Sequence, residues 1–258
     1  MNKLTTLFVT SIGVLLGISG ALAQDGPPTF TPVEIIGCNF VGNNDMSDLT
    51  PVIENFNEWA DEAGIDNYTA IISEPFFRNA QFPYDFLWIG MFADGAALGS
   101  VLHQWVNQSD DLPAQFDEVV DCPSRAGYAS VSLKAASGEG DGVEDGGKFI
   151  LEFTNCTVHE NRTGPEAAGA IREWIDYLTE NGSSSSHSLL VPGPGEASDA
   201  DYSFKWLKAH SSYISLGKEF ELNLNNGGIG MRNDLFGRVM SCDSSRIYNS
   251  SFARESAG

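Results

Sequence analysis

Apolar residues in the first part of the chain recur with two periods, which predict a series of strands and helices. Leu49, Val52 and Phe56 fall on one face of a helix, with Pro51 in its first turn and Gly64 just past its end. Alternating and aromatic-rich runs predict strands on either side of this helix. The predicted elements are a strand at 33–40, a helix at 49–63, strands at 68–73 and 84–91, a helix at 96–107 and, after a short amphipathic turn, a strand at about 125–133.

The second part of the chain repeats this series. Ile171, Trp174 and Leu178 reproduce the apolar face of the first helix, between Pro165 and Gly182. The other predicted elements are a first strand through Leu151 and Phe153, strands at 187–191 and 202–207, a helix at 213–223, a loop at the Gly-rich stretch 227–230 and a last strand at about 246–252.

An internal repeat explains this similarity. At an offset of 118 residues Cys38 falls opposite Cys156, and Trp88 falls opposite Trp206. Between the matching parts lies an acidic, Gly-rich run without aromatic residues, which is typical of a flexible linker. The predicted boundaries are 24–136 for the first repeat, 137–147 for the linker and 148–258 for the second repeat.

The order β-α-β-β-α-β within each repeat is that of the ferredoxin-like fold. Two helices then cover one face of an antiparallel sheet, and the other face needs a partner. Alternation places three aromatic side chains of each third strand on one face, and we predict that they line the contact between two stacked sheets. These residues are Tyr84, Phe86 and Trp88 in the first repeat and Tyr202, Phe204 and Trp206 in the second. The predicted fold is α+β, with two tandem ferredoxin-like repeats packed sheet to sheet as an intramolecular pseudo-dimer.

This arrangement resembles the dimeric α+β-barrel superfamily in a fused, two-repeat form. The resemblance extends from residue 24 to the end of the chain, and it rests on element order, duplication and aromatic strands rather than on a signature motif. The superfamily includes stress-responsive barrel proteins, cofactor-free quinol monooxygenases, polyketide cyclases and haem-dependent members. The resemblance therefore implies a fold without choosing an activity.

The four cysteines are expected to form one disulfide bond in each repeat. Cys38 lies near the end of a first strand, and Cys122 lies just before the fourth strand, which runs antiparallel beside it. The same placement brings Cys156 next to Cys242. A zinc site is the alternative, but the chain has no Cys-x-x-Cys pair and its histidines do not accompany the cysteines. We therefore predict two disulfides and no metal.

The net charge limits which partners the protein can have, and the N-terminal residues indicate its compartment. The 258-residue chain carries 35 acidic and 14 basic side chains, a formal net charge of −21, which disfavours nucleic acid and anionic membranes as partners. Lys3, a short apolar stretch and Ala21-Leu22-Ala23 are typical of a signal peptide cleaved after Ala23. The protein is expected to be secreted or periplasmic, with no membrane insertion after cleavage and an undetermined oligomeric state.

Three residues are candidates for acid–base chemistry. His210 follows the aromatic strand of the second repeat, whereas Glu34 and Glu152 occupy equivalent positions on the two first strands. The alternative for the two acids is a structural ion pair with Arg125 and Arg246 on the neighbouring strands, and the alternative for His210 is an exposed loop. His210 is also the residue that a haem-binding protein would use as a ligand, although no haem motif accompanies it.

The sequence therefore predicts an exported protein that binds a small apolar or aromatic molecule between two ferredoxin-like sheets. It predicts no cofactor, and it does not establish catalysis. One alternative is a cofactor-independent monooxygenase or cyclase-like barrel enzyme that uses His210, Glu34 or Glu152 as a base. Another is a secreted structural or protein-interaction module.

Overall fold

The computed structural model describes residues 29–78, 82–136, 147–197 and 199–256. The predicted signal peptide and its cleavage site lie outside the described residues, as does the predicted linker except for Gly147. No helix in the described ranges is long and apolar enough to cross a membrane.

The described residues before the predicted linker contain four strands and three helices, and we call them the first half. These elements are β1 (Thr31–Phe40), α1 (Met46–Glu62), β2 (Tyr68–Phe77), β3 (Phe86–Phe92), α2 (Gly95–Gln108), α3 (Leu112–Val119) and β4 (Val120–Lys134). α1 begins at a capping box. The Asp45 carboxylate accepts hydrogen bonds from backbone N–H groups of the first turn, and the Asp48 carboxylate accepts one from the backbone N–H of Asp45. The short turn expected before the last strand is the helix α3.

The described residues from Gly147 onward form the second half. Its elements are β5 (Lys148–Val158), α4 (Gly164–Glu180), β6 (Ser186–Pro192), β7 (Phe204–His210), α5 (Tyr213–Leu224), α6 (Gly228–Phe236), β8 (Met240–Cys242) and β9 (Arg246–Arg254). The loop prediction for 227–230 is wrong. Gly227 has a φ of 85° and turns the chain out of α5, and α6 follows because Met231 and Phe236 pack against α4 and the sheet.

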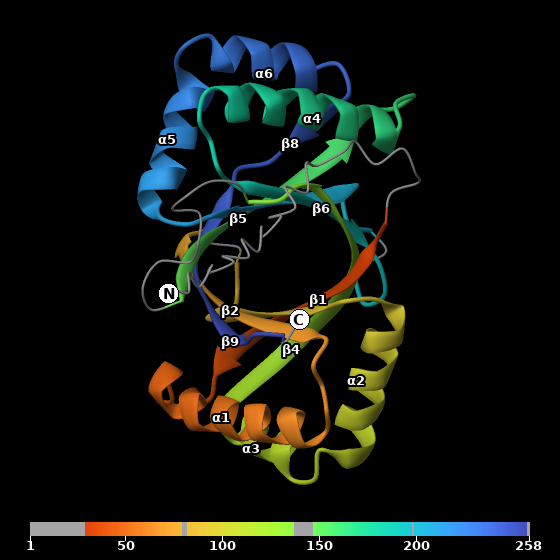
Figure 1. Ribbon diagram of the computed structural model, residues 1–258, viewed down its shortest axis with the longest axis vertical. Helices are drawn as coiled ribbons and strands as arrows, with labels where there is room; N and C mark the ends of the chain where they lie inside the picture. The colour runs from red at the N-terminus through yellow and green to blue at the C-terminus, as the bar shows by residue number, and fades with distance from the viewer. Residues whose placement is uncertain (1–28, 79–81, 137–146, 198, 257–258) are drawn as a thin grey trace, which may run out of the picture.

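The strands form one antiparallel sheet that closes into a barrel (Figure 1). The order is β7-β6-β4-β1-β3-β2-β9-β5-β8, and the pairing of β7 with β5 closes the ring. β8 and β9 pair with successive parts of one edge of β5, as the single long strand β4 does with β1. The expected stacking of two separate sheets is therefore wrong: the halves join edge to edge through β4–β6 and β2–β9, which satisfies the backbone groups that open edges would expose.

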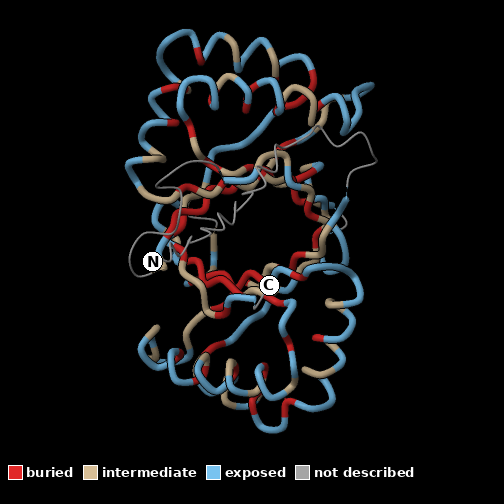
Figure 2. Tube along the Cα trace, in the orientation of Figure 1, coloured by how far each residue is buried: buried red, intermediate tan, exposed pale blue. Residues whose placement is uncertain are grey.

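The helices lie outside the barrel, with α1–α3 against the first half and α4–α6 against the second (Figure 1). Buried residues are concentrated along the barrel strands, whereas the outer turns of the helices are exposed (Figure 2). The core has three parts. One lies between the first-half strands and their helices, one lies between the second-half strands and their helices, and one lies inside the barrel.

The aromatic residues of β3 and β7 do not line a contact between sheets as predicted. Phe86 and Trp88 pack under the first-half helices, and Phe204 and Trp206 pack under the second-half helices. Tyr84, which precedes β3, packs against the core inside the barrel. Alternation shows which side chains share a face, but it does not show which face the helices cover.

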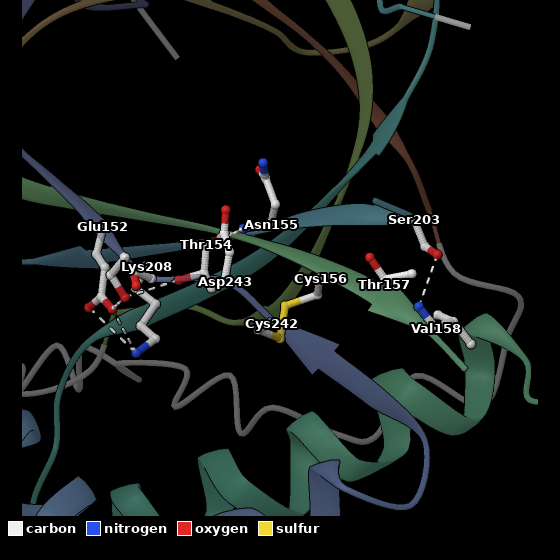
Figure 3. The surroundings of a disulfide bond; sticks show 12 residues. Glu152, Thr154, Asn155, Cys156, Thr157, Val158, Ser203, Lys208, Cys242 and Asp243 are labelled. Carbon is white, nitrogen blue, oxygen red and sulfur yellow. Dashed lines mark hydrogen bonds and ion pairs between the residues drawn. A yellow bond between two sulfur atoms is a disulfide. The ribbon is translucent and has the colours of Figure 1, made fainter. Parts of the chain in front are cut away.

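Both predicted disulfide bonds are confirmed. Cys38 pairs with Cys122 across 84 residues, and Cys156 pairs with Cys242 across 86 residues. In the second half the bond joins β5 to β8 (Figure 3). In the first half the bond lies beside a pocket, which is described next.

Candidate functional site

The first half contains a pocket of about 300 Å³ between the sheet and its helices. β1 and β3 form its floor through Ile36 and Trp88, and α1, α2 and α3 form its walls. The pocket therefore lies between the sheet and its helices, whereas the ligand was predicted between two ferredoxin-like sheets.

Aromatic side chains from five elements, α1, β2, β3, α2 and α3, surround this pocket. Phe56 lies at their centre, with its ring centroid 5.3 Å from that of Trp88 and in edge contact with it. Trp59 and Trp105 meet at 5.6 Å, and Phe116 lies 6.0 Å from Trp105. Phe56 and Trp59 are three residues apart on α1 and so share a face, which brings both against α2 and α3. Such a wall favours flat apolar ligands.

A polar end of the pocket is built around the carboxylate of Glu34, and Asp117 of α3 is a further charged residue in the pocket lining. Arg125 donates to Glu34 Oε2 from Nε at 2.8 Å and from Nη2 at 2.5 Å, so the alternative of a structural ion pair is observed here. The Tyr68 hydroxyl donates to Glu34 Oε1 at 3.3 Å and accepts from Trp88 Nε1 at 2.8 Å. Burial, together with the charge of Glu34, raises the pKa of Tyr68 well above 10, so this hydroxyl stays protonated.

Gly90 makes this polar end possible. It pairs with Glu34 in the sheet, and a Cβ at position 90 would lie 2.7 Å from both Glu34 Oε1 and the Tyr68 hydroxyl. The missing side chain therefore leaves the room into which the carboxylate and the phenol turn. A glycine inside a strand pattern is a sequence signal for such a close approach.

The second half holds a buried charged cluster in the corresponding space. Glu152 pairs with Lys208 in the sheet, and Lys208 Nζ lies 3.4 Å from both Glu152 oxygens (Figure 3). Lys208 Nζ also lies 3.0 Å from Glu219 Oε1. His210 Nε2 lies 3.3 Å from Glu152 Oε2, and Ser245 donates to Glu152 Oε1 at 2.5 Å. Glu152 thus does not pair with Arg246, which bonds to Asp243 instead.

Electrostatics keep this cluster charged. Burial disfavours the ammonium of Lys208, but the carboxylates of Glu152 and Glu219 outweigh burial and raise the pKa of Lys208. Burial likewise opposes the charge of Glu219, yet Lys208 lowers the pKa of this acid to about 2. His187, which contacts Ser185 at 3.0 Å, has its pKa lowered to about 3, chiefly by burial. The cluster therefore holds a cationic lysine, two carboxylates and a neutral His187 at pH 7.

Glu152, His210 and Glu219 are the described residues whose geometry could suit a metal ion, since their ligand atoms lie within 4.8 Å of one another. Lys208 Nζ already lies between the two carboxylates and supplies the positive charge there. A metal ion would have to displace that ammonium, so the donor set favours the lysine.

The structure separates the predicted site residues. Glu34 and Trp88 belong to the pocket, whereas His210 and Glu152 belong to the second-half cluster, so the three acid–base candidates do not form one site. His210 is buried rather than in an exposed loop. Six residues of the pocket were not predicted as site residues: Tyr68, Gly90 and the wall residues Phe56, Trp59, Trp105 and Phe116. The helical spacing of the four wall residues indicates a face that packs against the core. This spacing does not distinguish a filled core from one that contains a pocket.

Comparison with known proteins shows the fold alone. No family model matches this sequence, and no curated protein matches it. A solved structure of a candidate monooxygenase from Fusobacterium nucleatum has a TM-score of 0.56 at 9% identity, covering 89% of this chain and 96% of that one. The structure of a candidate monooxygenase from Lactobacillus acidophilus has a TM-score of 0.52 at 9% identity, covering 87% of this chain and 95% of that one. The structure of a DypB variant from Rhodococcus jostii, solved with haem, has a TM-score of 0.51 at 9% identity, covering 87% of this chain and 94% of that one. The chain has the dimeric α+β-barrel fold of these neighbours, as the resemblance predicts.

The haem complex contradicts the prediction that no cofactor is involved, because a structure of this fold holds one. The chemistry of the described pocket shows whether it suits haem. Haem iron takes a histidine, thiolate, methionine or tyrosinate ligand. The pocket residues include no histidine or methionine, their two cysteines are in a disulfide, and Tyr68 is held as a phenol. The described pocket thus does not fit a haem with a protein axial ligand.

Proposed function

We propose that this protein binds a small aromatic molecule in the first-half pocket. The observation that carries the proposal is a 300 Å³ space walled by Phe56 and three tryptophans, with a hydrogen-bonded ion pair at one end. Pockets for small ligands are mostly apolar and carry a few convergent polar groups, which is the arrangement here.

The polar end indicates the chemistry of the ligand. Arg125 uses Nε and Nη2 on Glu34, and its side chain is 46% exposed, which leaves Nη1 for an acceptor on a ligand. A carboxylate, carbonyl or phenolate on an aromatic ring would bond to this guanidinium while the ring lies against Trp88 and Trp105. The Glu34 carboxylate, neutralised by Arg125, orients the guanidinium.

Binding of 2-naphthoate tests this proposal. We expect the probe to quench tryptophan fluorescence and to raise the midpoint of thermal unfolding, because it contacts the tryptophan wall and binds the folded state alone. Gly90→Lys should weaken binding at least tenfold, since the new side chain fills the polar end. Met91→Lys is the matched control: it adds the same side chain at the next position of β3, which is exposed and on the other face, and it should bind normally.

Haemin is the second probe in the same experiment. Binding of 2-naphthoate that is equal in the wild type and Gly90→Lys would overturn the proposed pocket. A stoichiometric Soret band that persists in Gly90→Lys would place a haem site elsewhere in the molecule. A Soret band that is lost only in Gly90→Lys would make haem, or a porphyrin-like molecule, the ligand of this pocket.

Export is a further part of the proposal. Two disulfide bonds support it, because such bonds persist in oxidising compartments. N-terminal sequencing of the protein recovered from outside the cytoplasm should begin at Gln24, and a mature chain that retains Met1 would contradict cleavage.

Duplication of one ancestral unit is the last part. Support comes from the two halves having the strand orders β4-β1-β3-β2 and β9-β5-β7-β6. Each half also has a disulfide from its first strand, to the start of β4 in the first half and to β8, just before β9, in the second. Separate expression of 24–136 and 148–258 tests it, with association of the two pieces into the barrel as the expected outcome and failure to associate as the contrary one.

A further inference from the structure

An ammonium group in the second half lies against an indole ring and a carboxylate. Lys208 Nζ is 4.8 Å from the ring centroid of Trp206 and 3.4 Å from both oxygens of Glu152. The π electrons of a tryptophan ring attract a cation at such a distance, and the carboxylate adds a direct interaction between opposite charges. The second half therefore shows what this ring and this carboxylate hold when the neighbouring strand supplies a cation.

The first half has the same ring and carboxylate but no lysine beside them. Trp88 and Glu34 are the counterparts of the tryptophan and the glutamate, and Gly90 takes the position of the lysine. Trp88 and Glu34 both line the pocket. A ligand in this pocket can therefore bring its own ammonium to the place that a lysine side chain occupies in the second half.

Glu34 has an acceptor position for such an ammonium. Its Oε2 accepts two hydrogen bonds from Arg125, whereas its Oε1 accepts one, at 3.3 Å, from the Tyr68 hydroxyl. Each oxygen of a carboxylate can accept about two hydrogen bonds, so Oε1 can take another from a ligand. Gly90 lies directly beside Oε1 and has no side chain to cover it.

The guanidinium next to this carboxylate suits a group of the opposite charge. Nε and Nη2 of Arg125 hold Glu34, and Nη1 is left for an acceptor on the ligand. This end of the pocket thus places a cationic donor beside an anionic acceptor. An α-amino acid carries a carboxylate and an ammonium on one carbon atom, so its head group matches both side chains.

We propose that the ligand of the first-half pocket is an aromatic α-amino acid. Its carboxylate binds Arg125, its ammonium binds Glu34 Oε1 beside the ring of Trp88, and its aromatic side chain lies against the aromatic wall. The zwitterion has no net charge, so the formal charge of −21 does not repel it as it repels an aromatic acid. This inference rests on the proposed function, because it names the class of molecule that the same pocket takes.

Calorimetric titration with matched probes tests the place of the ammonium. L-Phenylalanine and 3-phenylpropionate have the same ring, chain and carboxylate and differ in the ammonium alone. We expect L-phenylalanine to bind the wild type more tightly than 3-phenylpropionate by about tenfold or more, because it adds a charged hydrogen bond. 2-Phenylethylamine lacks the carboxylate that Arg125 binds, and we expect it to be weaker than L-phenylalanine by about the same factor.

Two charge variants locate the ammonium. Glu34→Gln keeps an oxygen for Arg125 but loses the negative charge, so L-phenylalanine should lose its advantage over 3-phenylpropionate. 3-Phenylpropionate should bind this variant at least as well as it binds the wild type, which also shows that the variant is folded. Glu118→Gln is the matched control: it removes a charge from an exposed residue of α3 outside the pocket lining, and it should leave both affinities unchanged.

The results distinguish failure of this inference from failure of the proposed function. If neither 2-naphthoate nor L-phenylalanine binds, the proposed function fails and this inference fails with it. If 2-naphthoate binds but L-phenylalanine binds no better than 3-phenylpropionate, the pocket remains and the amino-acid assignment is overturned. An advantage of L-phenylalanine that persists in Glu34→Gln and disappears in Asp117→Asn would also overturn the assignment, since it would place the ammonium on α3.

Discussion

The two halves build the same framework around the same space, yet the first half leaves it open and the second fills it with charge. Glu34 and Glu152 occupy the same register, opposite Gly90 and Lys208 respectively. Gly90 therefore leaves space beside Glu34, whereas the side chain of Lys208 fills the equivalent space beside Glu152.

The helices differ at a matching position as well. Val101 is seven residues after the N-cap Asp94 of α2 (94 to 101), and Glu219 is seven residues after the N-cap Ser212 of α5 (212 to 219). Val101 lines the pocket, whereas Glu219 accepts from Lys208. Side chains at a few equivalent positions, on a common backbone plan, thus decide whether the half has a pocket or a buried lysine.

The disulfide bonds provide the largest test of how far the halves are alike. Replacing either pair with alanines, Cys38 with Cys122 or Cys156 with Cys242, should lower the free energy of unfolding by about 4–5 kcal/mol in the chain-entropy model, because the two loops have nearly equal lengths. Urea denaturation of the two double variants measures this. Only the first-half variant should also weaken 2-naphthoate binding, since Cys38 and Cys122 line the pocket. Equal losses of binding would contradict the comparison.

Lys208→Met should show how much the buried carboxylates of the second half destabilise the fold when they lack their cation. Glu152 and Glu219 would keep their burial and lose the ammonium between them, which should lower the free energy of unfolding by about 3–5 kcal/mol at pH 7. The carboxylates would then bind protons more readily, so the variant should recover part of this loss as the pH falls from 7 to 5.

The control for this change is Lys205→Met, on the same strand but the opposite face. It removes a cation without leaving a paired carboxylate, so its effect on unfolding should be below about 1 kcal/mol. Similar losses for the two variants in urea denaturation would contradict the importance of the buried cluster.

The framework could be predicted from the sequence because it depends on local and paired signals. Helical spacing around Phe56 and Trp174 located two helices, and the strand positions of Cys38 and Cys122 predicted their bond. The barrel was implied by the resemblance alone, and the way its halves join could not be derived from residue spacing because it depends on edge pairing between distant strands, such as Tyr128 with Pro192. No local pattern reports such a contact.

The candidate site was harder to predict than the framework. Phe86 and Trp88 were expected between two sheets, since a period of two assigns a face without saying what covers it. Gly90 is a weak signal on its own, and its role appears only when Glu34 and Tyr68 are brought opposite it. The pairing of Lys208 with Glu219 joins a strand to a helix through side chains that sequence spacing does not connect.

The pH dependence of stability provides the smallest test of the comparison. His187 is neutral in the folded state because burial lowers its pKa to about 3. The charged or titratable groups around it are Glu219, Lys208, Lys134 and His210. In the unfolded chain its pKa is about 6.5. Between these values the unfolded state binds the extra proton, so stability falls as the pH falls. From pH 7 to pH 5 the loss should be about 2 kcal/mol, at about 1.4 kcal/mol per pH unit below 6.5.

Two glutamine variants locate this effect in the second half. His187→Gln removes the titrating ring, so it should remove most of the loss between pH 7 and pH 5 in urea denaturation. His103→Gln changes an exposed histidine of α2 in the first half and should leave the loss intact. If His103→Gln flattened the profile as much as His187→Gln, the pH response would not come from the buried cluster, and the contrast between a hollow half and a charged half would lose its thermodynamic consequence.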